Sequence, residues 1–284
     1  MINSLTATSP RTSWEVVRSV AASRLRMMSR YRGWFLLDIM IPTMLAAIPI
    51  LLGQAMAGPN AGENFRLNTG TDNYVAYLLI GSNVFMVVSG AMWNFGFWLR
   101  REQQTGTLEA LYLAPTSKWL ILSGVALYGA LRSIVNFGMA FTLGCLLFRV
   151  NPFQGDILLA LAFLLVGLIP LYGVSLLYGA VVLKLKEANA MIQLAQWTVS
   201  FLMGVFFPIA IFPPLLRAVA LLFPPTWMNN GVRASLLGVG WFFQTWYRDL
   251  AVLFAFCAVT PVLGYWIFLR TERRIKANEG VGQF

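Results

Sequence analysis

The stretch from Arg100 to Ser117, RREQQTGTLEALYLAPTS, carries side chains that could bind another protein. Glu102 and Glu109 supply carboxylates, which form charge-assisted hydrogen bonds with lysine or arginine side chains of a partner. Gly106 allows a sharp backbone entry or a close approach by that partner. The pattern up to Pro115 predicts a short amphipathic helix lying across a loop. From these residues alone, a docking helix and a solvated loop both remain open.

The residue types that build catalytic and metal sites are scarce. The 284 residues include no histidine, which removes the usual acid/base catalyst near neutral pH and the commonest metal ligand. Cys145 and Cys257 lie in different apolar runs, so we interpret both as packing residues and expect neither a metal site nor a disulfide. A phosphate-binding loop requires a Gly-Lys pair, and the sequence has none. The sequence therefore predicts no phosphate-binding loop of this type in this chain.

The composition indicates which elements must position these residues. Hydrophobic residues make up 58% of the chain and charged residues only 11%, with a mean hydropathy of +0.68. Soluble proteins contain about a quarter charged residues. The chain is therefore predicted to be an all-α polytopic membrane protein.

Six segments have the roughly 20 apolar residues that a helix needs to cross a bilayer core of about 30 Å. They run approximately from Trp34 to Met56, Tyr77 to Leu99, Leu120 to Phe148, Ile157 to Leu183, Met191 to Phe212 and Leu250 to Leu269. Prolines inside or near these runs are expected to kink the helices without ending them. They are Pro42, Pro49, Pro170, Pro208 and Pro261. The stretch that begins at Arg100 then connects the second and third spans.

The distribution of lysine and arginine predicts the orientation, because cytoplasmic loops carry an excess of these residues. With both termini inside, fifteen of the 21 lie on the cytoplasmic side and five outside, and Arg132 lies within the third span. We therefore expect a multi-pass protein of the cell membrane with cytoplasmic N- and C-termini. The net charge of +10 is explained by attraction to anionic membrane lipid, so no nucleic acid partner is expected.

The N-terminal segment from Trp14 to Arg30 can form a surface helix. Its apolar residues recur at spacings of three and four: Trp14, Val17, Ala21, Leu25 and Met28. Such a helix would lie in the cytoplasmic interface, although a simple basic flank remains the alternative. We expect one transmembrane domain over residues 1–284. It comprises the interfacial helix in 1–33, a six-span bundle in 34–269 and a cytoplasmic tail in 270–284.

Two motifs resemble those of one transporter family. The run E-x-x-x-G-T-L-E-A-L from Glu102 to Leu111 resembles the cytoplasmic loop of the membrane-spanning subunits of type-2 ABC exporters. A second match, FFPIAIFPPLLRAVALLFPPTWMNNGVRASLLG, lies between spans five and six. The residues that match the family's pattern there are Phe207-Pro208, Phe212-Pro213, Leu215 to Leu222, Pro225 with Trp227, and Arg233 with Gly238. The doubled prolines Pro213-Pro214 and Pro224-Pro225 depart from that pattern.

The resemblance implies how the protein would assemble and work. Two such subunits, identical or homologous, would form the pathway, and separate ATPase subunits holding ATP and Mg would dock beneath them. The permease itself would bind no cofactor. The stretch after Arg100 would be the coupling helix, and the segment after span five a re-entrant helical pair on the extracellular side. The expected coupling residues are Glu102, Thr105, Gly106, Thr107, Leu108 and Glu109; those of the re-entrant element are Pro208, Pro213, Pro225, Trp227 and Arg233.

The resemblance also places spans two and five along the central path. Their candidate cargo contacts are Asn83, Asn94, Phe97, Trp98, Gln193, Gln196, Trp197 and Phe201. Uncharged polar groups beside aromatic rings suit an amphipathic or lipophilic molecule, although helix packing uses the same residue types. Export of a drug-like compound is favoured, because the chain most resembles the drug-resistance branch. Export of polysaccharide or a lipid-linked glycan is the alternative.

Arg132 stands near the middle of the third span. An arginine facing lipid there would cost roughly 2.5–3.5 kcal/mol on insertion scales, so its side chain should face protein or water. A structural ion pair or a hydrogen bond to carbonyl groups is favoured over a contact with cargo.

Two other classes compete with an ATP-driven exporter. An ATP-independent channel or secondary transporter would normally carry carboxylates within the membrane for ion coupling. No acidic residue is central in any predicted span, because Asp38 and Asp249 lie near span ends. An integral-membrane enzyme would need a catalytic cluster, which the absence of histidine disfavours.

Overall fold

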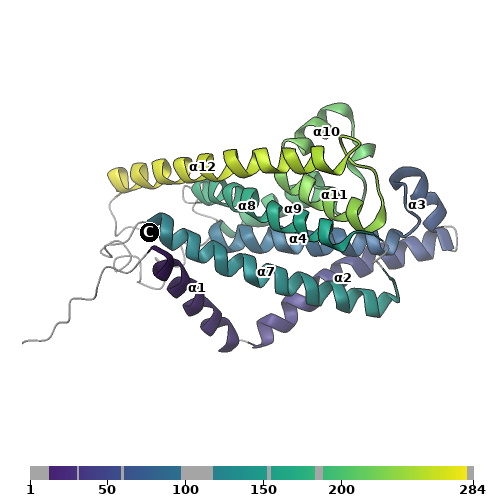
Figure 1. Ribbon diagram of the computed structural model, residues 1–284, viewed down its shortest axis with the longest axis horizontal. Helices are drawn as coiled ribbons and strands as arrows, with labels where there is room; N and C mark the ends of the chain where they lie inside the picture. Colours follow the sequence, from purple (N-terminus) through teal and green to yellow (C-terminus); the bar gives the residue numbers. More distant parts are fainter. Residues whose placement is uncertain are drawn as a thin grey trace, which may run out of the picture.

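The computed structural model describes residues 13–30, 32–58, 61–96, 118–151, 155–182 and 188–279, and within them the regular structure is entirely helical (Figure 1). The α-helices are α1 (Ser13–Arg30), α2 (Arg32–Ala57), α3 (Ala61–Thr69), α4 (Tyr74–Gly96), α7 (Lys118–Phe148), α8 (Ile157–Val182), α9 (Ala188–Leu202), α10 (Pro214–Leu221), α11 (Pro224–Leu237) and α12 (Trp246–Glu279); a 3₁₀ helix, η2, covers Ile209–Ile211. The expectation of an all-α chain is confirmed for this part of the protein.

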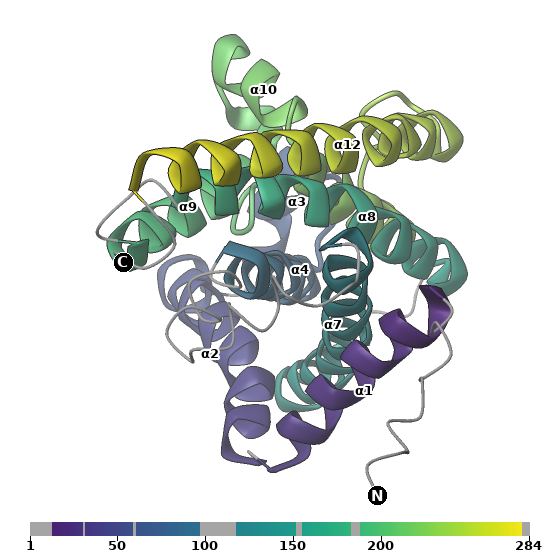
Figure 2. The same ribbon diagram turned by 90° about the vertical axis from the view of Figure 1, so that its left-hand side faces the viewer.

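The long helices run roughly along one axis of the molecule. The beginnings of α1 and α7 and the end of α12 lie at one end, and α3, α10 and α11 lie toward the other (Figure 1). Viewed along that axis, α4 is central, with α2, α7, α8 and α9 around it and α12 on the outside of α8 (Figure 2). Buried residues of α4, including Leu79, Ile80 and Val88, form the middle of the hydrophobic core.

Five helices of the described part are long and apolar enough to cross a membrane. The candidate spans are Leu36–Met56, Tyr74–Trp93, Trp119–Phe148, Ile157–Val181 and Trp246–Arg274. They coincide with the first, second, third, fourth and sixth predicted spans. Helix α12 continues well beyond the predicted end at Leu269, and its 34 residues would extend about 51 Å.

The fifth predicted span is shorter than the sequence suggested. We expected it to run from Met191 to Phe212, but α9 ends at Leu202. Gly204 has a φ of 62°, and its N–H donates to the carbonyl of Phe201, while Val205 N–H donates to the carbonyl of Ser200. This is the Schellman arrangement that ends a helix at a left-handed glycine. The apolar run continues past Gly204, which is why hydropathy alone did not detect the end.

The proline inside α8 is accommodated by a side chain of a neighbouring helix. Pro170 lacks an N–H and leaves the carbonyl of Val166 without its helical donor. The thiol of Cys257, on α12, donates to that carbonyl at 3.4 Å. Of the five prolines expected to kink helices, Pro208 is the exception, because it precedes η2 in extended conformation and lies outside any helix.

Helices α8 and α12 approach each other closely through glycines. A methyl group on Gly173 would overlap the backbone of Thr260 and Pro261, and one on Gly264 would overlap the carbonyl of Gly173. The hydroxyl of Thr260 also donates to the carbonyl of Pro170 at 3.1 Å. Small residues at such crossings let backbones pack without intervening side chains, as is common between membrane helices.

The N-terminal helix occupies the range expected for a surface helix and packs against the first turns of α7. A Cβ atom on Gly124 of α7 would lie 2.7 Å from Val20 Cβ and 3.0 Å from the carbonyl oxygen of Val17. Ala21, the next residue of α1, is also buried, whereas Trp14 is exposed. Helix α1 is therefore fixed to the bundle by one face and leaves its N-terminal tryptophan uncovered.

Candidate functional site

The helical backbone breaks at the end of α9, and four successive carbonyl groups there have no backbone N–H donor from the helix. The break comprises the residues Leu202, Met203, Gly204 and Val205. Unpaired carbonyls cost several kcal/mol each where water is excluded. Three of the four residues are buried, and Leu202 is partly buried, so the partners of these carbonyls must come from other parts of the protein.

One face of α11 supplies every partner. The hydroxyl of Thr226 donates to the carbonyl of Leu202 at 3.5 Å, and the amide of Asn229 donates to that of Met203 at 2.8 Å. Arg233 donates to the carbonyls of Gly204 and Val205 at 2.8 and 2.6 Å. Residues 226, 229 and 233 follow the i, i+3, i+7 spacing of a single helical face. We call these three side chains the α11 ladder.

Arg233 joins three elements at the centre of this arrangement. Its side chain is only 2% exposed, and its Nε also donates to the carbonyl of Tyr77 on α4 at 3.2 Å. The guanidinium carbon lies 3.6 Å from the centroid of the Tyr77 ring, a cation–π geometry. Burial lowers the pKa of Arg233 from 12.5 to about 10, so the side chain stays charged at neutral pH. Gly81 leaves room for it, since a methyl group there would overlap the guanidinium.

The doubled prolines begin the two short helices of this region. Pro214 stands in the first turn of α10, and Pro224 and Pro225 in the first turn of α11, where a proline loses no helical hydrogen bond. Trp227 donates its indole N–H to the carbonyl of Leu221, near the end of α10, at 2.8 Å. The departure from the family's pattern therefore strengthens both helix starts.

The connection from α11 to α12 is fixed by a buried carboxylate. Asp249 accepts hydrogen bonds from the backbone N–H groups of Phe242 and Phe243, both at 2.9 Å. Those two rings pack on Trp227. Asp249 thus holds the loop against the start of α11 and serves the structure of this region.

The candidate path residues of α9 lie mostly on one exposed face. Gln193, Trp197 and Phe201 follow one another at intervals of four residues, and the last two are 61% and 46% exposed. The Phe201 ring contacts those of Phe207 and Phe212, with centroids 5.5 and 5.0 Å away. The face therefore continues directly into the aromatic residues after the break.

The other candidate path residues are placed differently. Gln196 points toward α4 and donates to the hydroxyl of Ser89. Asn83 is 1% exposed, and its amide donates to the carbonyl of Leu79 in its own helix at 2.8 Å. Asn94 lies in α4, and Phe97 and Trp98 lie outside the described residues. The structure thus brings Gln193, Trp197 and Phe201 together at a surface, turns Gln196 toward α4 and places Asn83 in the core.

Arg132 forms an ion pair with Asp38 between α7 and α2. The amide of Asn136, one turn along α7, donates to the same carboxylate at 3.1 Å. The side chains of Arg132 and Asp38 are 26% and 19% exposed, so the pair is partly open to its surroundings. Asp38 lies near the beginning of α2, and the middle of α7 packs against that turn of α2.

Removing one partner of this pair should destabilise the protein more than removing both. Arg132→Leu leaves Asp38 without its cation, and we expect a cost of about 1–3 kcal/mol, reduced from fully buried cases by the partial exposure. Asp38→Asn combined with Arg132→Leu should recover most of that loss. The measurement is the unfolding temperature in detergent of the single and double variants. Unchanged stability of Arg132→Leu together with lost transport would instead assign the arginine to the cargo path.

The expected coupling residues, Glu102 to Glu109, lie outside the described part, so their conformation stays a prediction. Sequence reasoning missed Asp38, Thr226 and Asn229 as partners in polar contacts. The spacing of Thr226, Asn229 and Arg233 was a usable signal, because three polar residues on one face of an apolar segment require buried partners. Asp38 carried no such signal. Within the described ranges, no group of three or more Cys, Asp or Glu side chains could hold a metal ion.

Comparison with known families agrees with this architecture. The sequence profile described as "ABC-2 family transporter protein" matches residues 41–266, which includes α4, the α9 break and the α11 ladder. A search of curated proteins gives no match. Because the family match covers most of the chain, this multi-pass membrane protein belongs to the ABC-2 transporter family, as a membrane subunit.

Proposed function

We propose that this subunit lines the path of an ATP-driven exporter for a drug-like or lipophilic molecule. The observation that carries the proposal is the exposed face of α9, where Gln193, Trp197 and Phe201 lie in one row. Aromatic rings with an interspersed amide bind apolar molecules that carry a few polar groups. The row leads to Phe207 and Phe212, which would form the exit.

ABC-2 membrane subunits have no ATPase domain and bind no cofactor themselves; they pair with ATPase subunits. In our proposal a second membrane subunit, identical or homologous, completes the path, and the ATPase subunits bind ATP and Mg. An ATP-independent channel or secondary transporter is the competing function. It would transport cargo in proteoliposomes that lack the ATPase.

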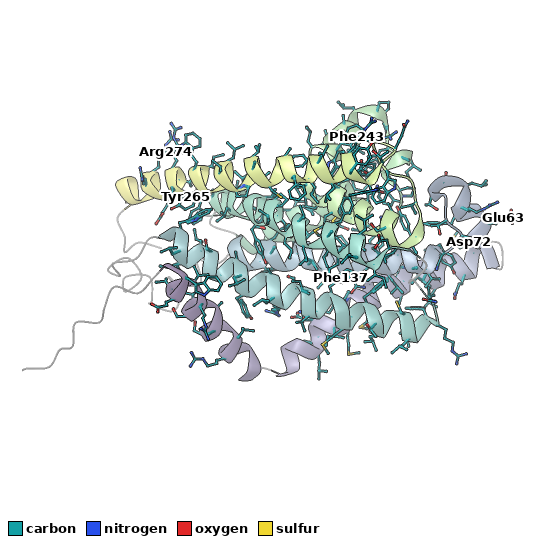
Figure 3. The ribbon with its side chains drawn as sticks, in the orientation of Figure 1. Glu63, Asp72, Phe137, Phe243, Tyr265 and Arg274 are labelled. Carbon is teal, nitrogen blue, oxygen red and sulfur yellow. The ribbon has the colours of Figure 1, made fainter. Side chains whose placement is uncertain are left out.

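We propose six spans in a single transmembrane domain of residues 1–284, with α9 as a short fifth span and both termini cytoplasmic. The support is the cluster of Arg270, Arg273 and Arg274 at the end of α12. Arg274 lies at one end, and Glu63 and Asp72 lie at the opposite end (Figure 3). Under the positive-inside rule the arginine-rich end faces the cytoplasm. In this proposal helices α10 and α11 form the re-entrant element, and the α11 ladder supplies donors to the carbonyls of the adjacent α9 break, because irregular backbone within a membrane needs partners from the protein.

The cargo class can be tested directly. Purified complex with its ATPase, reconstituted in proteoliposomes, should show ATP-dependent transport of lipophilic drug-like compounds and ATPase stimulation by them. Trp197→Ala and Phe201→Ala should weaken that stimulation, whereas Leu215→Ala, an exposed apolar change on α10, should not. Stimulation by a lipid-linked glycan and by no drug-like compound would favour glycan export.

The coupling stretch gives a second test of the proposal. Glu109→Lys would reverse the charge of the proposed contact with the ATPase, and Gly106→Val would place a branched side chain where the proposed coupling helix calls for φ > 0 or a close approach, at about 1–3 kcal/mol. Both variants should insert normally, because the packed spans stabilise the bundle. We expect cargo to stop altering ATP hydrolysis, measured as cargo-stimulated ATPase activity in proteoliposomes.

Membrane abundance and the variant Gln104→Lys serve as controls. The control adds a positive charge to the same stretch at a position outside the expected coupling residues, so stimulation should persist. Full stimulation and transport in both test variants would make the stretch a solvated loop and remove the coupling proposal.

A further inference from the structure

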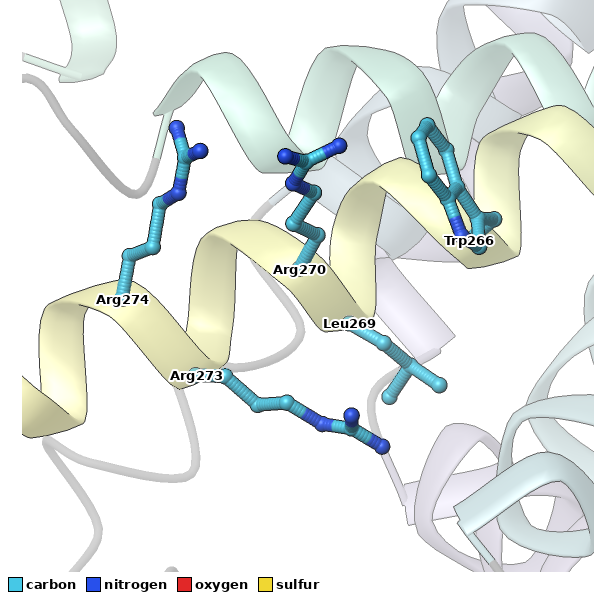
Figure 4. Close-up of a pocket in the computed structure, with 5 residues that line it drawn as sticks. All are labelled: Trp266, Leu269, Arg270, Arg273 and Arg274. Atoms are coloured by element: carbon cyan, nitrogen blue, oxygen red, sulfur yellow. The ribbon is translucent and has the colours of Figure 1, made fainter.

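The end of α12 carries a pocket that neither the α9 face nor the α11 ladder uses. Its described lining residues are Trp266, Leu269, Arg270, Arg273 and Arg274, and its volume is about 450 Å³ (Figure 4). In Figure 4 the side chains of Trp266, Arg270 and Arg274 extend toward one edge of a common helix face, and those of Leu269 and Arg273 toward its other edge. The guanidinium carbon of Arg270 lies 5.2 Å from the centroid of the Trp266 ring. The pocket therefore combines three cations with one large aromatic ring.

The opposite face of this part of α12 holds it against the bundle. Phe268, Thr271 and Glu272 are buried. The ring of Tyr265 contacts that of Trp119 on α7, with centroids 4.7 Å apart. The pocket thus lies on the outward face of the helix, and its described lining contains no carboxylate that would neutralise the arginines.

The arginines continue an exposed apolar stripe along the same face. Val259, Val262, Leu263 and Trp266 are all exposed, with Trp266 at 56%. Spacings of three, four and seven residues place them on the face that carries Arg270, Arg273 and Arg274. From Val259 to Trp266 the helix rises about 10 Å, which is most of the half-thickness of about 15 Å of a bilayer core. The stripe is apolar over the depth of acyl chains and basic where it ends.

We propose that this face binds an anionic phospholipid. Arg270, Arg273 and Arg274 hold the headgroup phosphate, since guanidinium groups bind phosphate oxygens in bidentate fashion. Trp266 lies at the level of the headgroup boundary, where tryptophan is favoured, and an acyl chain lies along the valine and leucine side chains. Basic pockets of this kind at membrane surfaces select anionic headgroups. The site depends on the membrane placement of α12 and not on the cargo.

The test measures lipid affinity of the purified full-length protein by native mass spectrometry. Dioleoylphosphatidylglycerol and dioleoylphosphatidylcholine are titrated separately, and inorganic phosphate is added in a third arm. We expect Arg270→Gln with Arg274→Gln to weaken binding of the anionic lipid about 30-fold, since each arginine near a membrane surface contributes roughly fivefold. Trp266→Leu, which keeps all charges, should also weaken it. Affinity for the zwitterionic lipid should not change.

The matched control is Arg217→Gln with Arg248→Gln, which removes two exposed arginines away from the pocket. It should leave anionic lipid binding within about twofold of wild type, well below the loss expected for two site arginines. An equal loss of lipid affinity in this control would show that general charge attraction, and not a defined site, binds the anionic lipid. Full displacement of the lipid by inorganic phosphate would make it a site for a free anion. Dissociation of the membrane subunits in the site variant would make the face a subunit interface. Any of these outcomes overturns the proposal, and none of them bears on export.

Discussion

Replacing Arg233 by methionine is expected to destabilise the protein by about 3–5 kcal/mol, the range for breaking a buried charged contact. Methionine fills similar volume but donates no hydrogen bond, so the carbonyls of Tyr77, Gly204 and Val205 lose the donors they have in the wild type. Unsatisfied buried carbonyls carry their full desolvation cost. The unfolding temperature of the purified subunit in detergent should fall by about 10 °C, and its abundance in membranes should drop.

Arg217→Met is the matched control, because Arg217 is exposed on α10 in the same region. It should change the unfolding temperature by little, since surface substitutions usually stay within about 0.5 kcal/mol. Arg233→Lys keeps the charge, yet a single ammonium group cannot reproduce the planar fork that reaches three carbonyls. Arg233→Lys should therefore lower the unfolding temperature by less than Arg233→Met does. Wild-type stability of Arg233→Met would show that the α11 ladder does not hold the break.

Adding one methyl group at the α8–α12 crossing should destabilise the protein about as much as Arg233→Met does. Gly264→Ala places a Cβ atom against the carbonyl of Gly173, and Gly173→Ala places one against the backbone of Thr260. Backbone cannot rotate away as a side chain can, so the helices must separate and lose packing along their length. We expect each variant to lose about 3 kcal/mol, the upper end for overpacking, measured as unfolding temperature in detergent.

Gly138→Ala tests whether the loss comes from the crossing. Gly138 lies in α7, another membrane helix, and a methyl group there meets no atom within 4 Å. Alanine is the better helix former, so this variant should be neutral or more stable by up to about 1 kcal/mol. Comparable losses at Gly138 and Gly264 would contradict close backbone packing between α8 and α12.

The long apolar helices were predictable from the sequence because hydropathy over 20 residues depends on composition and not on neighbours. Five predicted spans coincide with helices that could cross a membrane. The same property explains the error at the fifth span. Gly204 ends α9 by its positive φ, and a glycine inside an apolar run does not reveal its conformation until its surroundings are known.

The candidate site was predictable in part. The resemblance indicated Arg233 and Trp227 as members of one element, but their partners are backbone carbonyls of other segments. Every residue carries such a carbonyl, so no sequence pattern distinguishes those of Gly204 and Val205. Similarly, the carboxylate of Asp38 near one end of α2 meets Arg132 near the middle of α7. That contact depends on how the two helices are offset, which hydropathy does not encode.

The α11 ladder also determines how force can travel through the subunit. A break in a membrane helix is commonly a hinge, because its freed carbonyls allow bending. Here Thr226, Asn229 and Arg233 of a second helix donate to all four carbonyls, so bending would require these hydrogen bonds to break, including the two charge-assisted ones from Arg233. We therefore expect the end of α9 and helix α11 to move together. We expect a displacement of α9 near Ala188 to move α11 as well, because the chain does not bend at Gly204. The flexible part of this end of the molecule would then be the exposed helix α10.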